Sequence, residues 1–416
     1  ALQRDLLAMA EKPTLILSNL DTSLTHLLAQ IEQVKGRDPF QPVTVLLPAT
    51  HALRFFRQRL GSTLAVHLLQ FYSLAEAVLQ KAGSPVALIS DTALRRTISA
   101  ILTDMAQAGR LTSFGPMIDK PGFISVLLAW LREMKSQGIP PETYQAYADQ
   151  NPTARDAQLA AFYTRFQRTL QARGVADPDG RLWLAAEALE KDPVLTLYPG
   201  PLFVLGHDQF TPVELRILQS LADRFTSTTL YLPWSAARDG DDLALTRLQE
   251  TRRALQAHLD WVVRALPESP RPDPTLGHLG DHLFKLSPRA VPPGSALQCI
   301  EAPSREAEVR IALRLAKQWL LDGVTPGGIG LLAPNPETYR ALVRTVGEAY
   351  GLPLALDLPL IEHPLVQDLI NLLQLAPDFS WRQTFQALRS PFIQQPWLIA
   401  EQVDQLDRLS REQPVL

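Results

Sequence analysis

The sequence predicts an α/β protein with two parallel-sheet lobes, the first of which is interrupted by an all-helical insertion. Short apolar runs alternate with helical patterns over residues 14–79, and this alternation returns near residue 202 and again near residue 297. Strands that alternate with helices predict a parallel sheet covered by helices on both faces. Between Asp91 and Lys191 only helical patterns are found, which predicts a helical module placed within the first lobe.

Three apolar runs open the first lobe and are expected as buried strands: Thr14–Leu17, Pro42–Leu47 and Ala65–Leu69. Amphipathic helices are expected after them, from Asp21 to about Val34, from Thr50 to Leu60 and from Ser73 onward. Asp21 is the expected cap of the first helix. The helical module should contain four helices, which start near Asp91, Phe123, Ala154 and Asp179, with Asp91 as the cap of the first.

The stretch from Leu202 to Leu232 contains the clearest local signals of the chain. Leu202–Leu205 and Thr228–Leu232 are expected as strands. Between them, Thr211 is expected to cap a helix that has Pro212 at its first position and Glu214 three residues after the cap. These elements make one βαβ unit, and the loop after its first strand lies where open α/β sheets bind ligands.

Prolines crowd the region after this unit, which we expect to be a linker, and a second lobe should follow it. In that lobe Leu297–Ile300 and Gly328–Leu332 are expected as strands, and Ser304 as a helix cap. The expected parts are 1–90 with 192–266 for the first lobe, 91–191 for the helical insertion, 267–294 for the linker, 295–375 for the second, incomplete lobe and 376–416 for the start of a further helical module.

The composition is that of a large soluble protein. The chain has 416 residues, 46% of them hydrophobic, and no apolar run reaches the length of a membrane span. A net charge of −3 excludes a global basic field but not a local positive channel. The single cysteine, Cys299, excludes an internal disulfide or a cysteine-ligated cluster within this chain. We expect a cytoplasmic protein without a signal peptide. We also expect a piece of a longer chain, because the sequence opens with Ala1 rather than Met and stops at Leu416 just after a helical stretch.

The loop after the first strand lacks the residues of a phosphate cradle. Such a cradle uses glycines, which let backbone N–H groups approach the phosphate, and a lysine that contacts it. Neither is present, and Asp21 would repel a phosphate, in a loop that consists of Ser18, Asn19, Leu20, Asp21, Thr22 and Ser23. A nucleotide-hydrolysing helicase would also carry a magnesium-holding acidic pair near residue 205, where Leu205 and Gly206 stand instead. We therefore expect no catalytic residue, no nucleotide cofactor and no metal in this chain.

Two other clusters have both a functional and a structural interpretation. His207 and Asp208 could act as base and acid, but without a partner in the sequence such a pair is more often an exposed turn. The second cluster combines cations with aromatic rings: Arg54, Phe55, Phe56, Arg57 and Arg59. It could stack on a nucleic-acid strand, although the favoured interpretation is an inward-packed phenylalanine and a solvated face of arginines.

The ordered motifs resemble the amino-terminal part of the AddB/RexB family, with kinship to RecC. Gly122-Phe123-Ile124, followed by Glu133-Met134-Lys135 and Gly138-Ile139, is similar to a Gly-Phe…Glu-x-Lys…Gly-Ile helix of that family. Phe210-Thr211-Pro212-x-Glu214 and Ala302-Pro303-x-Arg305-Glu306 resemble two further family motifs. The opening Ser18-Asn19-Leu20-Asp21 is closer to the RecC amino terminus.

The resemblance implies two RecA-like (P-loop NTPase-like) lobes in a subunit of a bacterial helicase–nuclease complex that resects double-strand breaks for recombination. It implies a non-hydrolysing scaffold that binds and guides DNA, in particular single-stranded DNA, beside an AddA-like motor subunit and away from membranes. Many family members carry a Gly-Ser-Gly-Lys-Thr-like first loop, which is absent here. The iron–sulfur cluster and magnesium of the family would belong to a nuclease domain outside this chain.

Two alternatives stay open: an active ATP-dependent helicase or nuclease subunit with an unusual nucleotide site, and an unrelated two-lobed α/β transferase. Under the favoured interpretation, the DNA groove runs across loops that follow the strands, and its residues are His51, Arg54, Gln70, Tyr72, Ser73 and Asn335. Phe71 is expected to fill the gap between sheet and helix. Tyr72, whose hydroxyl needs a polar partner, is expected to stack on a base. Binding should be weak and strongly salt-dependent.

Overall fold

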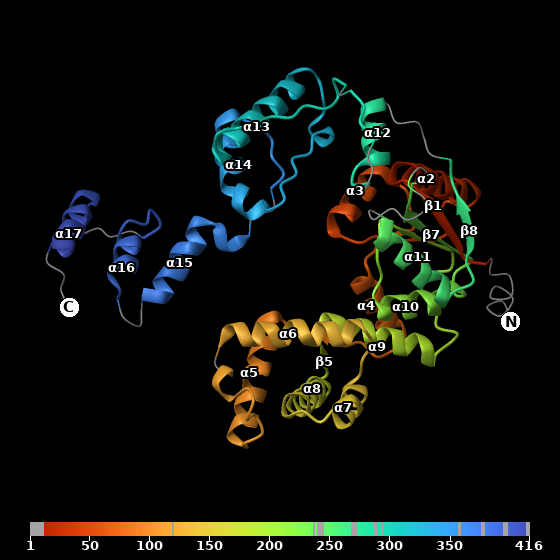
Figure 1. Cartoon of the computed structure of the whole chain (residues 1–416), viewed down its shortest axis with the longest axis horizontal. Coiled ribbons are helices and arrows are strands. Elements are labelled where there is room, and N and C mark those ends of the chain that lie inside the picture. Colours follow the sequence, from red (N-terminus) through yellow and green to blue (C-terminus); the bar gives the residue numbers. More distant parts are fainter. Residues whose placement is uncertain are drawn as a thin grey trace. The chain divides into compact units, whose positions relative to one another are not determined.

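The structure is a computed structural model of the chain. It describes residues 12–118, 120–235, 238, 245–267, 273–285, 289–292, 294–356, 359–375, 379–393 and 398–412. The chain divides into two compact units, Ala1–Leu297 and Gln298–Leu416, each of which is described by itself (Figure 1).

The first unit is built on a six-stranded sheet in which every neighbouring pair of strands is parallel. The strands are β1 (Thr14–Ser18), β2 (Val43–Leu46), β3 (Val66–Leu69), β6 (Pro201–Leu205), β7 (Ser227–Pro233) and β8 (Val262–Ala265). Their order across the sheet is β3-β2-β6-β7-β1-β8. The chain leaves the sheet after β3 and returns at β6, beside β2. The prediction that the first five of these strands share one parallel sheet is confirmed.

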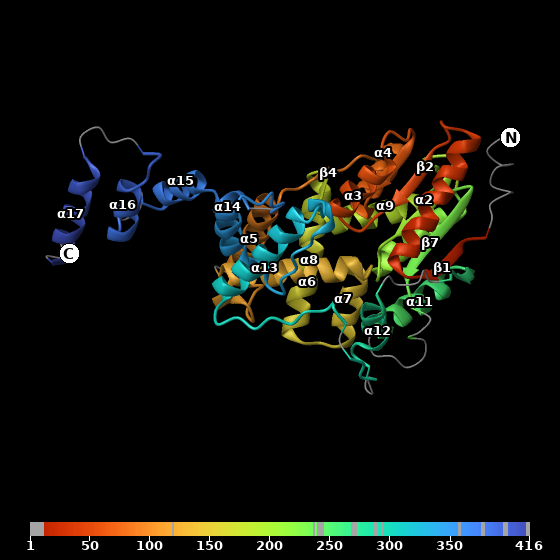
Figure 2. The same cartoon turned by 90° about the horizontal axis from the view of Figure 1, so that it is seen from above.

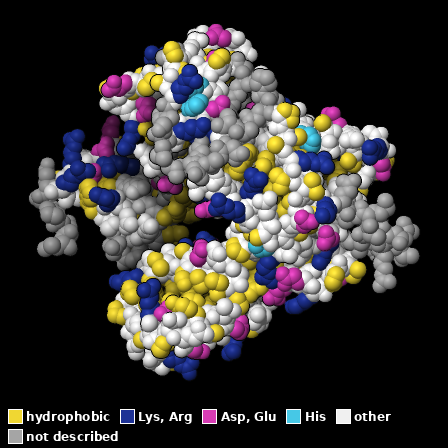
Figure 3. Space-filling view, turned by 45° about the vertical axis from the view of Figure 1, so that its right-hand side comes forward, with side chains coloured by type: hydrophobic (Ala, Val, Ile, Leu, Met, Phe, Trp, Pro, Cys, Tyr) yellow, Lys and Arg dark blue, Asp and Glu magenta, His cyan; other side chains and the backbone are white. Residues whose placement is uncertain are grey.

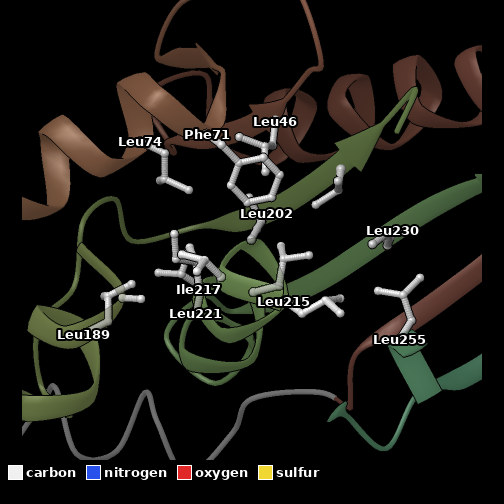
Figure 4. Packing of buried hydrophobic residues seen from close by; sticks show 14 of the residues in the cluster. Leu46, Phe71, Leu74, Leu189, Leu202, Leu215, Ile217, Leu221, Leu230 and Leu255 are labelled. Carbon is white, nitrogen blue, oxygen red and sulfur yellow. The ribbon is translucent and has the colours of Figure 1, made fainter. Parts of the chain in front are cut away.

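Helices cover both faces of this sheet. One face is covered by α2 (Leu20–Arg37) and α3 (Thr50–Leu60), the other by α4 (Phe71–Lys81), α9 (Pro178–Lys191), α10 (Pro212–Ala222) and α11 (Thr246–His258). Successive side chains of a strand point to opposite faces, so in β1 Ile16 joins the first core while Leu15 and Leu17 join the second. Figure 4 shows the second core, where Phe71 and Leu202 pack above Leu215.

Four helices between β3 and β6 form a core of their own and lie together in both views (Figures 1 and 2). They are α5 (Asp91–Gln107), α6 (Pro121–Ser136), α7 (Pro141–Gln150) and α8 (Ala154–Ala172). We call residues 91–172 the helical segment. A parallel ladder of two short strands, β4 (Ala87–Leu88) and β5 (Val175–Ala176), closes the segment where the chain enters and leaves it.

A buried ion pair joins the helical segment to α9. Lys135 of α6 is 1% exposed, and its Nζ donates to Oδ2 of Asp177 at 2.6 Å while lying 5.0 Å from the centre of the Phe166 ring. Asp177 also caps α9, because its Oδ1 accepts from the N–H of Gly180 at 2.6 Å. A Cβ atom at Gly180 would lie 2.7 Å from that oxygen. The Glu-x-Lys motif of the sequence therefore contributes a packing and positioning lysine.

Two predicted helix caps are wrong by one or two positions. Asn19, the first residue after β1, has an extended backbone and its Oδ1 accepts from the N–H of Thr22 at 2.9 Å. The expected cap Asp21 therefore lies inside the first turn, where a negative charge favours the helix dipole. Ser90 caps α5 in place of Asp91, because its Oγ is one residue earlier and accepts from the N–H of Ala93.

The predicted capping box of α10 is confirmed. Thr211 Oγ1 accepts from the N–H of Glu214 at 3.2 Å, and Glu214 Oε2 accepts from the N–H of Thr211 at 2.8 Å. Five helices and strands of this unit were not predicted: β4, β5, β8, α7 and α11. A sixth, α12 (Pro274–His282), lies in the region expected as a linker. Asp273 caps α12 and Pro274 is its first residue, so a start signal was present among the prolines.

The second unit is helical in its described part. Its helices are α13 (Arg305–Leu321), α14 (Pro336–Tyr350), α15 (Pro364–Leu375), α16 (Trp381–Leu388) and α17 (Ala400–Glu412). Val309 and Leu313 of α13 pack against Val343 and Val346 of α14. Ser304 caps α13 as predicted, since its Oγ accepts from the N–H of Ala307 at 3.2 Å.

The two strands expected in the second lobe are wrong. Neither Leu297–Ile300 nor Gly328–Leu332 pairs with another strand, and Leu332 is almost fully exposed. An apolar run becomes a strand only where a neighbour takes up its backbone hydrogen bonds. Such a neighbour is absent from the described residues of this unit, so the structure does not confirm a second sheet lobe.

Candidate nucleic-acid interface

The carboxyl edge of the six-stranded sheet is the first place to look for a ligand site. Strands β1 and β7 are neighbours, but the helices that follow them, α2 and α11, cover opposite faces of the sheet. The same is true of the neighbours β2 and β6, which are followed by α3 and α10. Where neighbouring connections diverge in this way, an open α/β sheet leaves a crevice that commonly binds ligands. The two crevices differ in the residues that line them.

At the β1–β7 crevice the chain turns directly from strand to helix. One residue, Asn19, separates β1 from α2. Its side chain takes up the N–H of Thr22, and its carbonyl accepts from the N–H of Ser23 at 2.9 Å. The hydroxyls of Ser18 and Ser23 are buried and lie 2.7 Å apart in a hydrogen bond. The predicted loop Ser18–Ser23 is therefore a capped helix start whose polar groups bond to one another.

At the β2–β6 crevice the chain buries a histidine. Leu205 points into the core beneath α2 and α3, and Gly206 adopts a φ of +83° against Pro48. His207 follows, 9% exposed, with its ring centre 5.4 Å from that of Phe71 and 5.3 Å from that of Phe210. Burial lowers the pKa of His207 to about 4, against a smaller opposing effect of Asp208. The imidazole is therefore neutral at pH 7.

His207 and Asp208 do not form an acid–base pair. The backbone carbonyl of Asp208 accepts from Thr251 Oγ1 at 2.8 Å, while its exposed carboxylate lies 3.7 Å from Arg247. His207 Nε2 has no hydrogen-bond partner among the described residues. The expectation of an exposed turn holds for Asp208 and is wrong for His207, because two phenylalanine rings enclose the imidazole.

The residues predicted after β3 have different roles. The backbone N–H of Gln70 donates to Ser73 Oγ at 2.8 Å, and the Gln70 side-chain amide donates to the carbonyl of Pro48 at 3.3 Å. The Ser73 side chain therefore caps the first turn of α4, and the Gln70 side chain connects this turn to the loop after β2. Phe71 is buried in the core, as predicted. Tyr72 is 49% exposed, and its hydroxyl donates to Oδ1 of Asp179 at 3.4 Å.

Tyr72 lies in an open groove of about 670 Å³ between α4, α6 and α9. The charged residues of this groove are Arg132, Glu133, Asp179 and Arg181. Burial, followed by the charges of Asp179 and Glu214, raises the pKa of Tyr72 to about 12. Burial and the neighbouring Asp177 raise the pKa of Asp179 as well. The sequence could not reveal this groove, because its walls come from segments far apart in the chain.

His51 and Arg54 lie on the exposed face of α3, a helix that contains no acidic residue. Phe56 is buried, as the structural interpretation predicted, but Phe55 is 45% exposed and the Arg59 guanidinium lies 5.3 Å from the centre of its ring. In an α-helix, residues three and four apart share a face. The sequence thus gives α3 one basic, aromatic stripe: His51, Arg54, Phe55, Gln58 and Arg59. We call it the α3 stripe.

The sixth predicted residue, Asn335, precedes α14 in the second unit and is exposed. It is described with that unit alone, so the prediction that it shares a groove with the other five stays a prediction. Nowhere in the described ranges do three or more His, Cys, Asp or Glu side chains form a group that could hold a metal ion. No helix among the described residues is long and apolar enough to cross a membrane.

The fold and its sheet edge define a class of protein: an α/β unit whose parallel sheet is interrupted by a helical segment. Residues 26–261 match the family model described as "ADDB, N-terminal". Because the match covers more than half of the chain, the chain belongs to this family. Membership removes the alternative of an unrelated transferase.

Curated relatives carry one recurrent name, which designates each of them as the B subunit of an ATP-dependent helicase/deoxyribonuclease. The protein of that name from Desulforudis audaxviator is 28% identical over 363 residues, which are 80% of this chain and 30% of the relative. The one from Bacillus subtilis is 24% identical over 422 residues, 92% of this chain and 35% of the relative. The chain thus spans about a third of the length of these relatives.

Proposed function

We propose that this chain is the helicase-like, non-hydrolysing part of an AddB-type helicase–nuclease subunit, and that it binds and guides DNA during double-strand break resection and recombinational repair. The relatives' names supply the complex in which it would act. The single observation that carries the non-hydrolysing role is the one-residue connection between β1 and α2, where a nucleotide-binding protein needs a phosphate cradle.

The chemistry of that connection argues against bound ATP. A phosphate at a helix start is held by free backbone N–H groups and by the positive end of the dipole. Here Asn19 accepts from the N–H groups of Thr22 and Ser23, and Asp21 adds a negative charge to the first turn. The place of a magnesium-holding acid is taken by Leu205, which is buried. Phosphate, metal and attacking water would all lack their protein partners.

Two surfaces support a role in binding single-stranded DNA. The α3 stripe offers cations beside an exposed aromatic ring, the combination on which single strands stack and pair. The groove at Tyr72 offers a second half-exposed ring, and its charged lining residues are Arg132 and Arg181 together with Glu133 and Asp179. We include in the proposal the RecA-like nature of the first lobe, an AddA-like motor subunit as partner, kinship to RecC and a cytoplasmic location. Of the domain division predicted from the sequence, the proposal keeps a first lobe that a helical insertion interrupts, but it assigns α9 to that lobe because α9 packs on the sheet. The nuclease, with its iron–sulfur cluster and magnesium, would lie outside this chain.

Calorimetric titration with ATP and Mg²⁺ tests the non-hydrolysing role. We expect no binding heat, because neither phosphate nor metal has ligands at the β1–β7 crevice. Titration of a hydrolysing motor protein under the same conditions serves as the positive control. Micromolar affinity, or ATP turnover by the purified chain, would instead support the remaining alternative of an active motor with an unusual nucleotide site.

Substitutions at the two surfaces test the DNA-binding role. We expect Tyr72→Ala and Arg54→Ala each to weaken binding of a labelled oligothymidylate in fluorescence anisotropy. Loss of a base-stacking ring costs about 1–3 kcal/mol, which is about fivefold to 150-fold in affinity. Tyr147→Ala and Arg168→Ala are the matched controls, since these side chains are also exposed but lie on the helical segment. Unchanged affinity in both test variants, with an intact fold, would place the DNA elsewhere.

A further inference from the structure

The helical segment carries an apolar groove that the proposed DNA binding does not use. The groove has a volume of about 590 Å³ and is lined by Ser113, Phe114, Met117, Lys120, Phe123, Val126 and Arg155. We call it the α6 groove, after the helix that holds Phe123 and Val126. The rings of Phe114 and Phe123 line this groove and stack with their centres 5.4 Å apart. Figure 3 shows hydrophobic side chains gathered on the lobe that this segment forms.

Two apolar side chains of the groove, Val126 and Met117, lie outside the core of the segment, whereas Phe114 and Phe123 pack against it. Leu127, Leu128 and Leu131 of α6 already fill that core. Val126 nevertheless faces solvent with 63% of its surface exposed, and Met117 with 41%. Single exposed apolar residues are ordinary, but a contiguous apolar hollow with a polar rim marks an interaction site.

The described residues that line the α6 groove carry only positive charge. Lys120 and Arg155 are the two charged residues among them, and neither forms an ion pair within the described part of the chain. Among the other exposed arginines of the segment, Arg95 lies 2.7 Å from Asp91 and Arg165 lies 2.7 Å from Asp104, whereas Arg96, Arg110 and Arg168 form no ion pair with a described residue. Complementary charge at a rim selects the partner and speeds its encounter. A matching partner must therefore carry carboxylates beside its apolar contact.

We propose that the α6 groove docks a segment of another protein that presents an apolar anchor side chain flanked by Asp or Glu. The anchor would pack on the stacked rings between Met117 and Val126, and the carboxylates would pair with Lys120 and Arg155. A nucleic-acid strand fits less well, because its affinity comes from rows of cations and open ring faces, whereas here two cations border rings that stack on each other. The proposal is independent of the proposed DNA-binding function.

A display library of short random peptides tests this docking site. The library is selected on the wild-type chain and counter-selected on Val126→Asp, which places a charge in the hollow. We expect the enriched peptides to share an aromatic or aliphatic anchor flanked by acidic residues. A resynthesised peptide should bind Val126→Asp about tenfold more weakly than wild type, since truncating or charging a central contact costs upward of about 1.4 kcal/mol.

A charge reversal supplies the matched control. In the double variant Lys120→Glu with Arg155→Glu, the enriched acidic peptide should lose binding, and its counterpart with Lys in place of each Glu should gain it. Both side chains are exposed, so the variant should keep the melting temperature of the wild type. The proposal is overturned if no peptide depends on Val126, if the enriched peptides carry no acidic residue, or if reversal does not exchange the preference. Loss of oligothymidylate binding in the double variant alone would assign the groove to nucleic acid and overturn it equally.

Discussion

The imidazole of His207 lies between the rings of Phe71 and Phe210, and burial lowers its pKa to about 4 from an ordinary value of 6.5. A histidine whose pKa is depressed by folding contributes stability above its ordinary pKa, and this stability is lost as the pH falls through the folded value. The chain should therefore lose about 3 kcal/mol of unfolding free energy between pH 6.5 and pH 4 through this residue.

Urea denaturation of wild type and His207→Met at pH 7 and near pH 4 checks this expectation. Methionine has similar bulk and does not titrate, so the variant should lose markedly less stability on acidification. His51→Gln is the matched control, because His51 is exposed on α3. Equal acid sensitivity of wild type and His207→Met would contradict the assignment.

The ion pair of Lys135 and Asp177 is the second residue-scale feature with a measurable consequence. Lys135→Met leaves the carboxylate of Asp177 buried without its cation, and removal of one partner from a buried pair costs about 3–5 kcal/mol. Adding Asp177→Asn removes the orphaned charge while an oxygen remains to cap α9. We expect the double variant to recover most of the loss in chemical denaturation. A loss below about 1 kcal/mol in Lys135→Met would show that the pair does not hold α6 to α9.

Among the elements, α10 gives the simplest test of local sequence chemistry. Thr211→Ala removes the side-chain oxygen that accepts from the N–H of Glu214, and loss of such a cap costs about 1 kcal/mol. The same change removes a hydrogen bond that Thr211 donates to the Glu214 carboxylate. Burial raises the pKa of Glu214, and the hydrogen bond from Thr211 opposes this effect by favouring the ionised carboxylate. The variant should therefore lose more unfolding free energy at pH 7 than below the ordinary pKa of a glutamate, where the carboxyl group is protonated. Denaturation at both pH values measures the difference, and equal losses would contradict it.

Elements with local signals could be predicted, and those that depend on distant partners could not. Alternating apolar runs predicted five strands of the sheet, and Thr211 with Pro212 and Glu214 predicted a helix start. Val262–Ala265 was missed because it becomes a strand only beside β1. Gly328–Leu332 was predicted as a strand for the opposite reason, since it has the composition of a buried strand but no neighbour in the described residues.

The candidate site was predictable only where one element forms it. The exposed face of α3 follows from its own sequence, although the exposure of Phe55 over Phe56 depends on how the helix packs on the sheet. The groove at Tyr72 brings together α4, α6 and α9, whose residues are far apart in sequence. The burial that raises the pKa of Asp179 is a property of that assembly, and no local pattern carries it.

At the scale of the whole molecule, the net charge of −3 means that the proposed DNA binding must come from local cations. Each phosphate contact releases a condensed counterion, so the logarithm of the affinity should fall linearly with the logarithm of the salt concentration. For single strands the slope is about −0.7 per phosphate contact. Replacing Arg54 should therefore make the slope shallower by about 0.7. An unchanged slope, measured by anisotropy over a salt series, would remove Arg54 from the interface.

The most direct test of the account is one anisotropy titration of labelled single-stranded DNA, performed with and without ATP and Mg²⁺. Under the proposed function the β1–α2 connection binds no nucleotide, and the α3 stripe is separate from that connection. We therefore predict salt-dependent DNA binding with the same dissociation constant in both titrations. A dissociation constant that changes with ATP and Mg²⁺, or the absence of DNA binding at low salt, would contradict the central claim that this chain binds DNA without using ATP.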